Sequence, residues 1–144
     1  MYKKQLFLLL VLSFANLNVN AEFLEKSIDK NKERFSKVAL DIWEFAEMGY
    51  QETKSSALLA SELQKEGFKI TKNVANIPTA FIAEYGSGGP IIGILGEFDA
   101  LPGLAQSNSP FKEVVSNETG AGHACGHHLF GAASAWAAVT IKEW

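Results

Sequence analysis

The sequence predicts an α/β layered domain, and two features of it lead to this prediction. After the first 21 residues come two amphipathic helical segments, followed by three segments with strand patterning. The last strand segment is wholly apolar, which is typical of a strand buried on both faces of a sheet. Helices packed on a sheet with such a central strand form an α/β layered architecture.

The two helices are expected at residues 22–47 and 54–66, where apolar side chains recur at helical spacing among lysines and glutamates. Thr53 is expected to cap the second helix, and Gly67 to end it. The apolar residues expected to face the core are Leu24, Ile28, Phe35, Val38, Ile42, Phe45, Leu59 and Leu63.

Three strands are expected next, at residues 68–74, 79–85 and 91–96. The glycines and proline of residues 86–90 predict a tight turn between the second and third strands. The third strand, with the sequence IIGILG, is expected to be buried on both faces.

The rest of the chain is expected to form a long loop and one more helix. Residues 100–122 lose all periodicity and are rich in glycine, serine and asparagine, which predicts a functional or mobile loop. Residues 129–141 are small and apolar, which predicts a tightly packed helix that starts right after a cluster of histidines.

Residues 1–21 have the pattern of a secretory signal peptide. Lys3 and Lys4 precede an apolar run, and the segment ends on small residues suited to cleavage after Ala21. The apolar run is about half of the roughly 20 residues that span a bilayer, so a stable membrane anchor is not expected. The chain is expected to be exported, to a periplasm or to the medium, with residues 22–144 as the mature part.

Composition excludes two classes of protein. The 144 residues suit a single domain, and their net charge is −3. Without residues 1–21 there are 11 basic and 16 acidic side chains and no basic cluster, so a nucleic-acid partner is not expected. Cys125 is the only cysteine, which excludes a disulfide scaffold.

The first chemically informative segment is GEFDALPGL, residues 96–104. It places Glu97 and Asp99 where the predicted buried strand ends, the edge at which open α/β sheets bind ligands. Residues two apart on an extended chain point to the same face, so the two carboxylates are expected to be neighbours. Neighbouring like charges call for a cation or a proton between them. Taken alone, this pair is also compatible with a solvated acidic loop.

The second informative segment is GAGHACGHHLFGAA, residues 120–133, with all three histidines and the only cysteine. His123, Cys125 and His127 alternate, so an extended segment would present them on one face. Imidazole and thiolate ligands suit zinc or another borderline divalent metal, and the field of the following helix would favour the thiolate. Two alternatives stay open: a small buried cysteine with incidental histidines, and a cysteine nucleophile activated by a histidine.

Together the two segments predict a hydrolytic metal centre. Such a centre polarises a carbonyl and lowers the pKa of water. A histidine ligand needs an acceptor for its second nitrogen, and Asp99 is the expected partner.

The pair GEFDALPGLAQ and GHACGHHLFGAA resembles the aminoacylase and carboxypeptidase family of metal-dependent amidohydrolases. It is most similar to the branch of p-aminobenzoyl-glutamate hydrolase and the hippurate and auxin-conjugate hydrolases. The stretches IWEFAEMGYQETKSSALLASELQKEGF and IPTAFIAEYGSGGP are also similar to that branch. The resemblance covers residues 30–142, with both signatures in the order and spacing of the family.

The resemblance implies roles for individual residues. Cys125 and His127 correspond to metal ligands, and Asp99 to the catalytic acid that steadies the site. Glu97 stands where the broader family has a histidine ligand, as is usual in this branch. His123 matches the branch as a residue beside the ligands. No role is carried over to His128.

The resemblance also implies an activity and an architecture. The expected reaction is hydrolysis of an amide bond of an N-acyl or N-aroyl amino acid, with two zinc or manganese ions in the complete enzyme. The expected fold is a layered α/β catalytic domain with a central mixed sheet flanked by helices, here incomplete. The family's smaller inserted domain, its general base and its remaining ligands are not in these residues, so the chain is expected to be an N-terminal portion.

Two expectations about the whole protein complete this interpretation. The complete enzyme is expected to be a homodimer, and this portion alone is expected to be inactive. The alternative from another functional class is an exported metal-binding or interaction module without catalysis.

Overall fold

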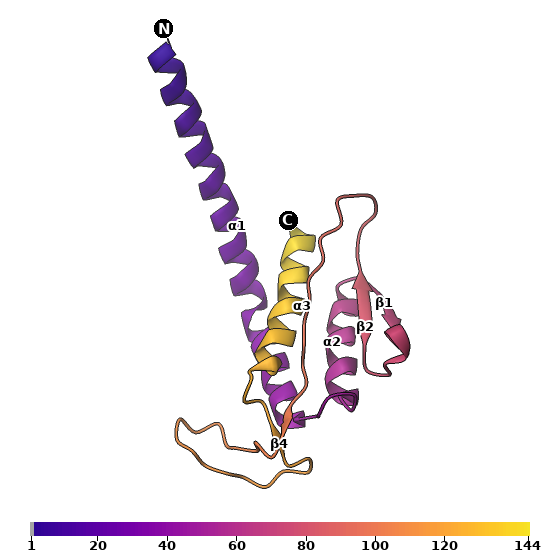
Figure 1. Cartoon of the computed structure of the whole chain (residues 1–144). Coiled ribbons are helices and arrows are strands. Elements are labelled where there is room, and N and C mark those ends of the chain that lie inside the picture. The colour runs from indigo at the N-terminus through magenta and orange to yellow at the C-terminus, as the bar shows by residue number, and fades with distance from the viewer. Residues whose placement is uncertain (1) are drawn as a thin grey trace.

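The computed structural model describes the backbone of residues 2–144 and the side chains of residues 21–144. Its helices are α1 (Tyr2–Phe45), α2 (Thr53–Lys65) and α3 (His127–Glu143). Its strands are β1 (Lys69–Lys72), β2 (Phe81–Glu84), β3 (Leu101–Pro102) and β4 (Ala121–Gly122). A short 3₁₀ turn, η1 (Val74–Asn76), lies between β1 and β2. Figure 1 shows α3 beside the C-terminal half of α1, and the β1–β2 hairpin beside α2.

The three helices share one apolar core. Phe35, Val38 and Ile42 of α1 are buried there, together with Leu59 and Leu63 of α2, as the helical periodicity predicts. The prediction is wrong for Leu24 and Ile28, which are exposed. The residues that α3 contributes are Ala132, Ala135 and Val139. Small side chains let α3 lie close to its neighbours, which places its N-terminal turn next to the end of α1.

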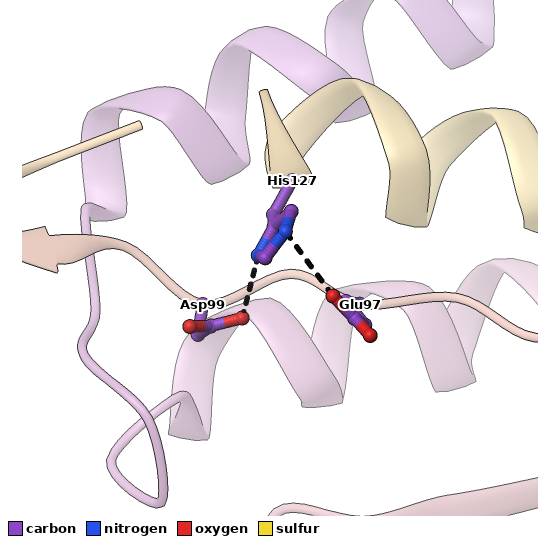
Figure 2. A group of neighbouring side chains, drawn as sticks. All are labelled: Glu97, Asp99 and His127. Atoms are coloured by element: carbon purple, nitrogen blue, oxygen red, sulfur yellow. Dashed lines mark hydrogen bonds and ion pairs between the residues drawn. The ribbon is translucent and has the colours of Figure 1, made fainter. Parts of the chain in front are cut away.

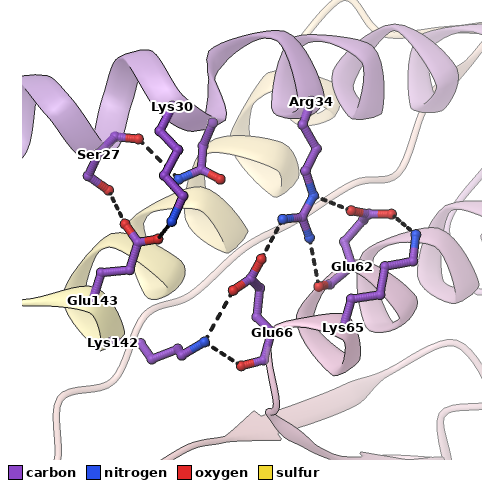
Figure 3. Close-up of polar contacts among 9 residues, drawn as sticks. Ser27, Lys30, Arg34, Glu62, Lys65, Glu66, Lys142 and Glu143 are labelled. Carbon is purple, nitrogen blue, oxygen red and sulfur yellow. Dashed lines mark hydrogen bonds and ion pairs between the residues drawn. The ribbon is translucent and has the colours of Figure 1, made fainter.

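An ion-pair cluster joins the helices at the edge of this core (Figure 3). Arg34 of α1 binds both Glu62 and Glu66, and Lys142 of α3 also binds Glu66. Hydrogen bonding to Arg34 lowers the pKa of Glu66, and the nearby Lys142 adds to the effect. We use the name ion-pair cluster for these residues and their neighbours Ser27, Lys30, Lys65 and Glu143.

The N-terminus of α2 is capped from a distance, so the prediction that Thr53 is the cap is wrong. Thr53 is the first helical residue. The free backbone N–H groups of Lys54 and Ser55 instead donate to the Glu47 carboxylate, at 2.9 and 2.8 Å. Glu47 is buried, and its backbone oxygen accepts the N–H of Ala100 at 2.7 Å. This residue therefore joins the end of α1, the start of α2 and the chain after Asp99.

The predicted third strand is not formed, and this is the main correction to the sequence-based fold. Residues 91–96 have no regular secondary structure, and Ile91, Ile92 and Leu95 are exposed. A strand needs partners for its backbone groups. Within residues 2–144 no backbone hydrogen bond pairs this segment with another. Figure 1 shows it as an extended trace between α3 and α2.

The sheets are small, and the expected central mixed sheet is absent from the described residues. β1 pairs with β2, and β3 with β4, each as an antiparallel two-stranded sheet. The β1–β2 hairpin confirms the first two predicted strands. The β3–β4 pair closes the base of the long loop predicted at residues 100–122.

The predicted signal peptide stays a prediction. The side chains of residues 1–20 lie outside the described part of the chain, and the structure continues the backbone of α1 through residues 2–21. Among the described helices, none combines the length and the apolar character needed to cross a membrane.

Candidate metal centre

The segment that ends in Glu97 and Asp99 lies directly against α3 because two glycines allow it. A Cβ atom on Gly131 of α3 would lie 3.0 Å from the Glu97 carbonyl oxygen, and one on Gly96 would lie 3.1 Å from Cβ of Ser134. The Ser134 hydroxyl also donates to the Leu95 carbonyl oxygen at 2.7 Å. These close contacts hold the segment along the first turns of α3.

Glu97, Asp99 and His127 come together at this point, and we call them the histidine–carboxylate group (Figure 2). Nδ1 of His127 lies 2.7 Å from Oδ1 of Asp99, and Nε2 lies 3.1 Å from Oε2 of Glu97. Both carboxylates therefore face the same ring, as their two-residue spacing predicts. The side chains are partly exposed, at 23% for His127, 32% for Asp99 and 49% for Glu97.

The two carboxylates of this group carry more negative charge than one histidine can balance. A neutral imidazole has one N–H, so it can donate to only one of the two carboxylates. The shorter contact assigns that proton to Nδ1, facing Asp99. Nε2 then presents a lone pair to the Glu97 carboxylate, an arrangement that favours a cation between the two atoms.

The group fits a divalent cation on two counts. One ligand atom from each of the three side chains lies within 4.8 Å of the others. Metal bonds of about 2.1 Å at angles between 90° and tetrahedral place two ligand atoms about 3.0–3.4 Å apart. The 3.1 Å between Nε2 of His127 and Oε2 of Glu97 lies in this range. Imidazole and carboxylate donors suit zinc and manganese.

Cys125 lies outside the histidine–carboxylate group and is exposed. The extended conformation expected for residues 123–127 is wrong. The N–H of Gly126 donates to the His123 carbonyl oxygen at 3.1 Å, closing a turn, and Gly126 has a positive φ of 78°. α3 then begins at His127, two residues earlier than predicted. His123, Cys125 and His127 therefore do not share one face.

The other two histidines, His123 and His128, are more shielded from solvent. His123 is buried and its Nε2 lies 3.0 Å from the Ile42 carbonyl oxygen. Its ring centroid lies 5.0 Å from that of His128, which in turn packs edge-on against Trp43. Burial lowers the pKa of both His123 and His128.

Two residues that shape this region are not indicated by the sequence. Trp43 carries no signal because it lies beside, and not on, the apolar stripe of α1. Glu47 carries none because its capping contact spans seven residues or more, whereas the usual cap signals are local. A glutamate shortly before a helix without a better cap is the one available signal.

No model of a protein family matches the chain, but individual proteins do. It is 41% identical over 122 residues to a p-aminobenzoyl-glutamate hydrolase subunit of Escherichia coli, covering 85% of this chain and 25% of that protein. It is 32% identical over 105 residues to N-acetylcysteine deacetylase of Bacillus subtilis, covering 72% and 27%. It is 29% identical over 93 residues to hippurate hydrolase of Campylobacter jejuni, covering 65% and 24%. The chain thus spans about a quarter of the length of these relatives.

Proposed function

The matched part of this chain belongs to the M20 amidohydrolases, and we propose that it supplies one side of a metal-dependent hydrolytic site. The proposed reaction is hydrolysis of the amide bond of an N-acyl or N-aroyl amino acid. The names of the relatives support this substrate class, since they describe hydrolases and a deacetylase of such compounds. The observation on which the proposal depends is the single imidazole of His127 between two carboxylates.

His127 and Cys125 are the proposed ligands of a divalent ion, zinc or manganese. Asp99 accepts the Nδ1 proton of His127 at 2.7 Å, which fixes the ring and leaves Nε2 free to bind. Cys125 lies two residues before His127 on an exposed turn, and it is proposed as the second ligand on the strength of the family resemblance.

Glu97 is proposed to act on the Nε2 side of His127. Its Oε2 is 3.1 Å from that nitrogen, and about half of its side chain is exposed. In this position the carboxylate can join the ligand set or hold a proton next to the substrate. When bound, a divalent ion supplies Lewis-acid chemistry that polarises a carbonyl and makes water more acidic.

The remaining groups of the site are proposed to come from polypeptide beyond these 144 residues. The chain matches only about a quarter of each relative, and three protein ligands are usual at a catalytic zinc. The division into a leader at residues 1–21 and a catalytic part at residues 22–144, the export of the protein and a homodimer of the complete enzyme are parts of the same proposal.

Amide hydrolysis by the complete protein that contains these residues, loaded with zinc or manganese, tests this function. The substrates are p-aminobenzoyl-glutamate, N-acetylcysteine and hippurate, and the released amino acid is measured. We expect His127→Ala to lower the rate by more than the roughly 100-fold typical of losing an outer partner of a ligand. Asp41→Asn, which changes a surface carboxylate paired with Lys37 on α1, is the control.

Three outcomes of this experiment are decisive. Loss of hydrolysis in His127→Ala but not in Asp41→Asn supports the proposal. Full hydrolysis by metal-free protein or by His127→Ala would contradict it. Tight metal binding without hydrolysis of any amide would favour the alternative, an exported metal-binding module without catalysis.

A further inference from the structure

Two side chains tie the C-terminus of α1 to the segment around β4. Carbonyl groups at the end of a helix can accept hydrogen bonds from side chains elsewhere. The Ile42 oxygen already accepts the Ala46 N–H at 3.2 Å, so the His123 ring is its second partner. Nε2 of His123 lies 3.0 Å from the Ile42 oxygen, and the Thr119 hydroxyl donates to the Ala46 oxygen at 2.9 Å. These two residues flank β4, which is therefore held on α1 from both sides.

His123 differs from Thr119 because it is also tied to the turn on its C-terminal side. The carbonyl oxygen of His123 accepts the Gly126 N–H at 3.1 Å and so closes the turn that contains Cys125. His127 comes directly after this turn, as the first residue of α3. A displacement of His123 would therefore move both proposed ligands, whereas Thr119 lies on the far side of β4.

The ring of His123 is held firmly enough to act in this way. Only 4% of the residue is exposed, and its ring packs against Trp43 and His128 at centroid distances of 6.2 and 5.0 Å. Because a carbonyl oxygen only accepts, Nε2 carries the proton. Nδ1 makes no hydrogen bond within the described part of the chain, although the backbone of Asp99 lies close enough to influence the pKa of the ring.

We propose that His123 is a positioning residue for the metal centre, because its bond to the Ile42 carbonyl fixes the turn that presents Cys125 and His127. The inference depends on the proposed function, in which these two residues hold a divalent ion. His123 itself does not bind the ion, and its effect is exerted through the backbone of the turn.

Two amide substitutions at His123 distinguish the effect of its hydrogen bond to Ile42 from the effect of filling the buried space. In His123→Gln the side-chain N–H₂ lies near the position of Nε2 and can still donate to Ile42. In His123→Asn the same group is one bond shorter and cannot reach. We expect zinc affinity, measured by competition with a chromophoric chelator, to stay close to the original in His123→Gln. In His123→Asn we expect it to fall by about 10- to 100-fold, as for other lost outer contacts.

Thr119→Val is the matched control, because it removes the other hydrogen bond to the end of α1 without changing the shape of the side chain. We expect both Thr119→Val and His123→Asn to lower the thermal unfolding temperature. Only His123→Asn should weaken zinc binding, with Thr119→Val staying within about twofold of the original affinity. His123→Leu keeps the burial, removes the donor and replaces the asparagine variant if that variant does not fold.

The outcomes separate this inference from the function that it builds on. Equal zinc affinity in the glutamine variant and in the variants without a donor would overturn the positioning role. An equal loss in Thr119→Val would also overturn it, since docking of β4 in general would then be the cause. An unchanged protein that binds no zinc would overturn the proposed metal centre itself.

Discussion

The ion-pair cluster and the histidine–carboxylate group differ in whether cations of the same chain balance their carboxylates. In the ion-pair cluster, each carboxylate meets a cation of the same chain: Glu62 and Glu66 bind Arg34, and Glu143 binds Lys30. In the histidine–carboxylate group, two carboxylates face one imidazole. The first region balances its charges from within the described chain, and the second has an excess of negative charge.

The ion-pair cluster therefore serves stability, and the histidine–carboxylate group is suited to a ligand. The ion-pair cluster surrounds a packed core of three helices, so its contacts serve the fold. The histidine–carboxylate group is partly exposed and is held in place by glycine contacts with α3. Changes in the first region should alter unfolding without altering metal affinity, and changes in the second should do the reverse.

The largest effect on stability is expected from Phe35→Ala in the helical core. Phe35 is 2% exposed and stacks on Trp136 with ring centroids 5.7 Å apart. Removing a buried phenylalanine side chain costs about 3–5 kcal/mol. Chemical denaturation measures the loss. Zinc affinity of the molecules that remain folded should stay within about twofold, since distant sites act independently. A large loss of zinc affinity in Phe35→Ala would show that the helical core and the histidine–carboxylate group are not independent.

Asp99→Asn should weaken zinc binding and leave the stability of the fold nearly unchanged. The amide no longer holds the Nδ1 proton of His127 as a carboxylate does, so zinc affinity should fall by about 10- to 100-fold. The free energy of unfolding should change little. Asp41→Asn is the control, because Asp41 is a carboxylate of similar exposure that pairs with Lys37 on α1. Such a surface pair contributes about 0–1 kcal/mol. Equal zinc affinity in the two variants would contradict the role of Asp99.

Gly131→Ala should disturb both properties, because it alters the contact that places the site on α3. The added methyl would lie 3.0 Å from the Glu97 carbonyl oxygen and 3.1 Å from Cβ of Phe98. We expect a loss of stability of about 1 kcal/mol, at the low end for overpacking, together with weaker zinc binding. Gly93→Ala is the matched control, since a Cβ there meets nothing within 4 Å. It should change stability by less than about 0.5 kcal/mol.

The smallest effect is expected from titration of the ion-pair cluster. Hydrogen bonding to Arg34 lowers the pKa of Glu66 below the ordinary value of 4.5. The stabilisation is therefore complete above pH 4.5 and is lost as the pH falls through the lower folded-state pKa. Denaturation curves between pH 7 and pH 3 should show a loss of at most about 1 kcal/mol for this pair. Glu66→Gln should reduce this acid-dependent loss, and an unchanged loss would contradict the assignment.

The parts of the fold that follow local rules were predictable from the sequence. Helical periodicity placed Phe35, Val38 and Ile42 in the core correctly. Alternation along the extended segment brought Glu97 and Asp99 to one ring, and Asp99 was correctly expected to be the partner of a histidine. These are contacts whose geometry is set within a few residues.

The failures concern features that depend on distant partners. The apolar segment of residues 91–96 has the composition of a buried strand, but a strand requires neighbours that the described residues do not provide. The start of α3 was misplaced because Gly126 adopts a positive φ and turns the chain before His127. That turn also separates Cys125 from the face expected for it.

Zinc binding by the protein and by its His127→Ala variant shows whether the histidine–carboxylate group is built around a divalent cation. Competition with a chelator at pH 7 gives both affinities, and far-ultraviolet circular dichroism shows whether the variant retains its helices. We expect tight binding that is lost in a folded His127→Ala protein. Zinc retained with the same affinity by that variant would contradict it.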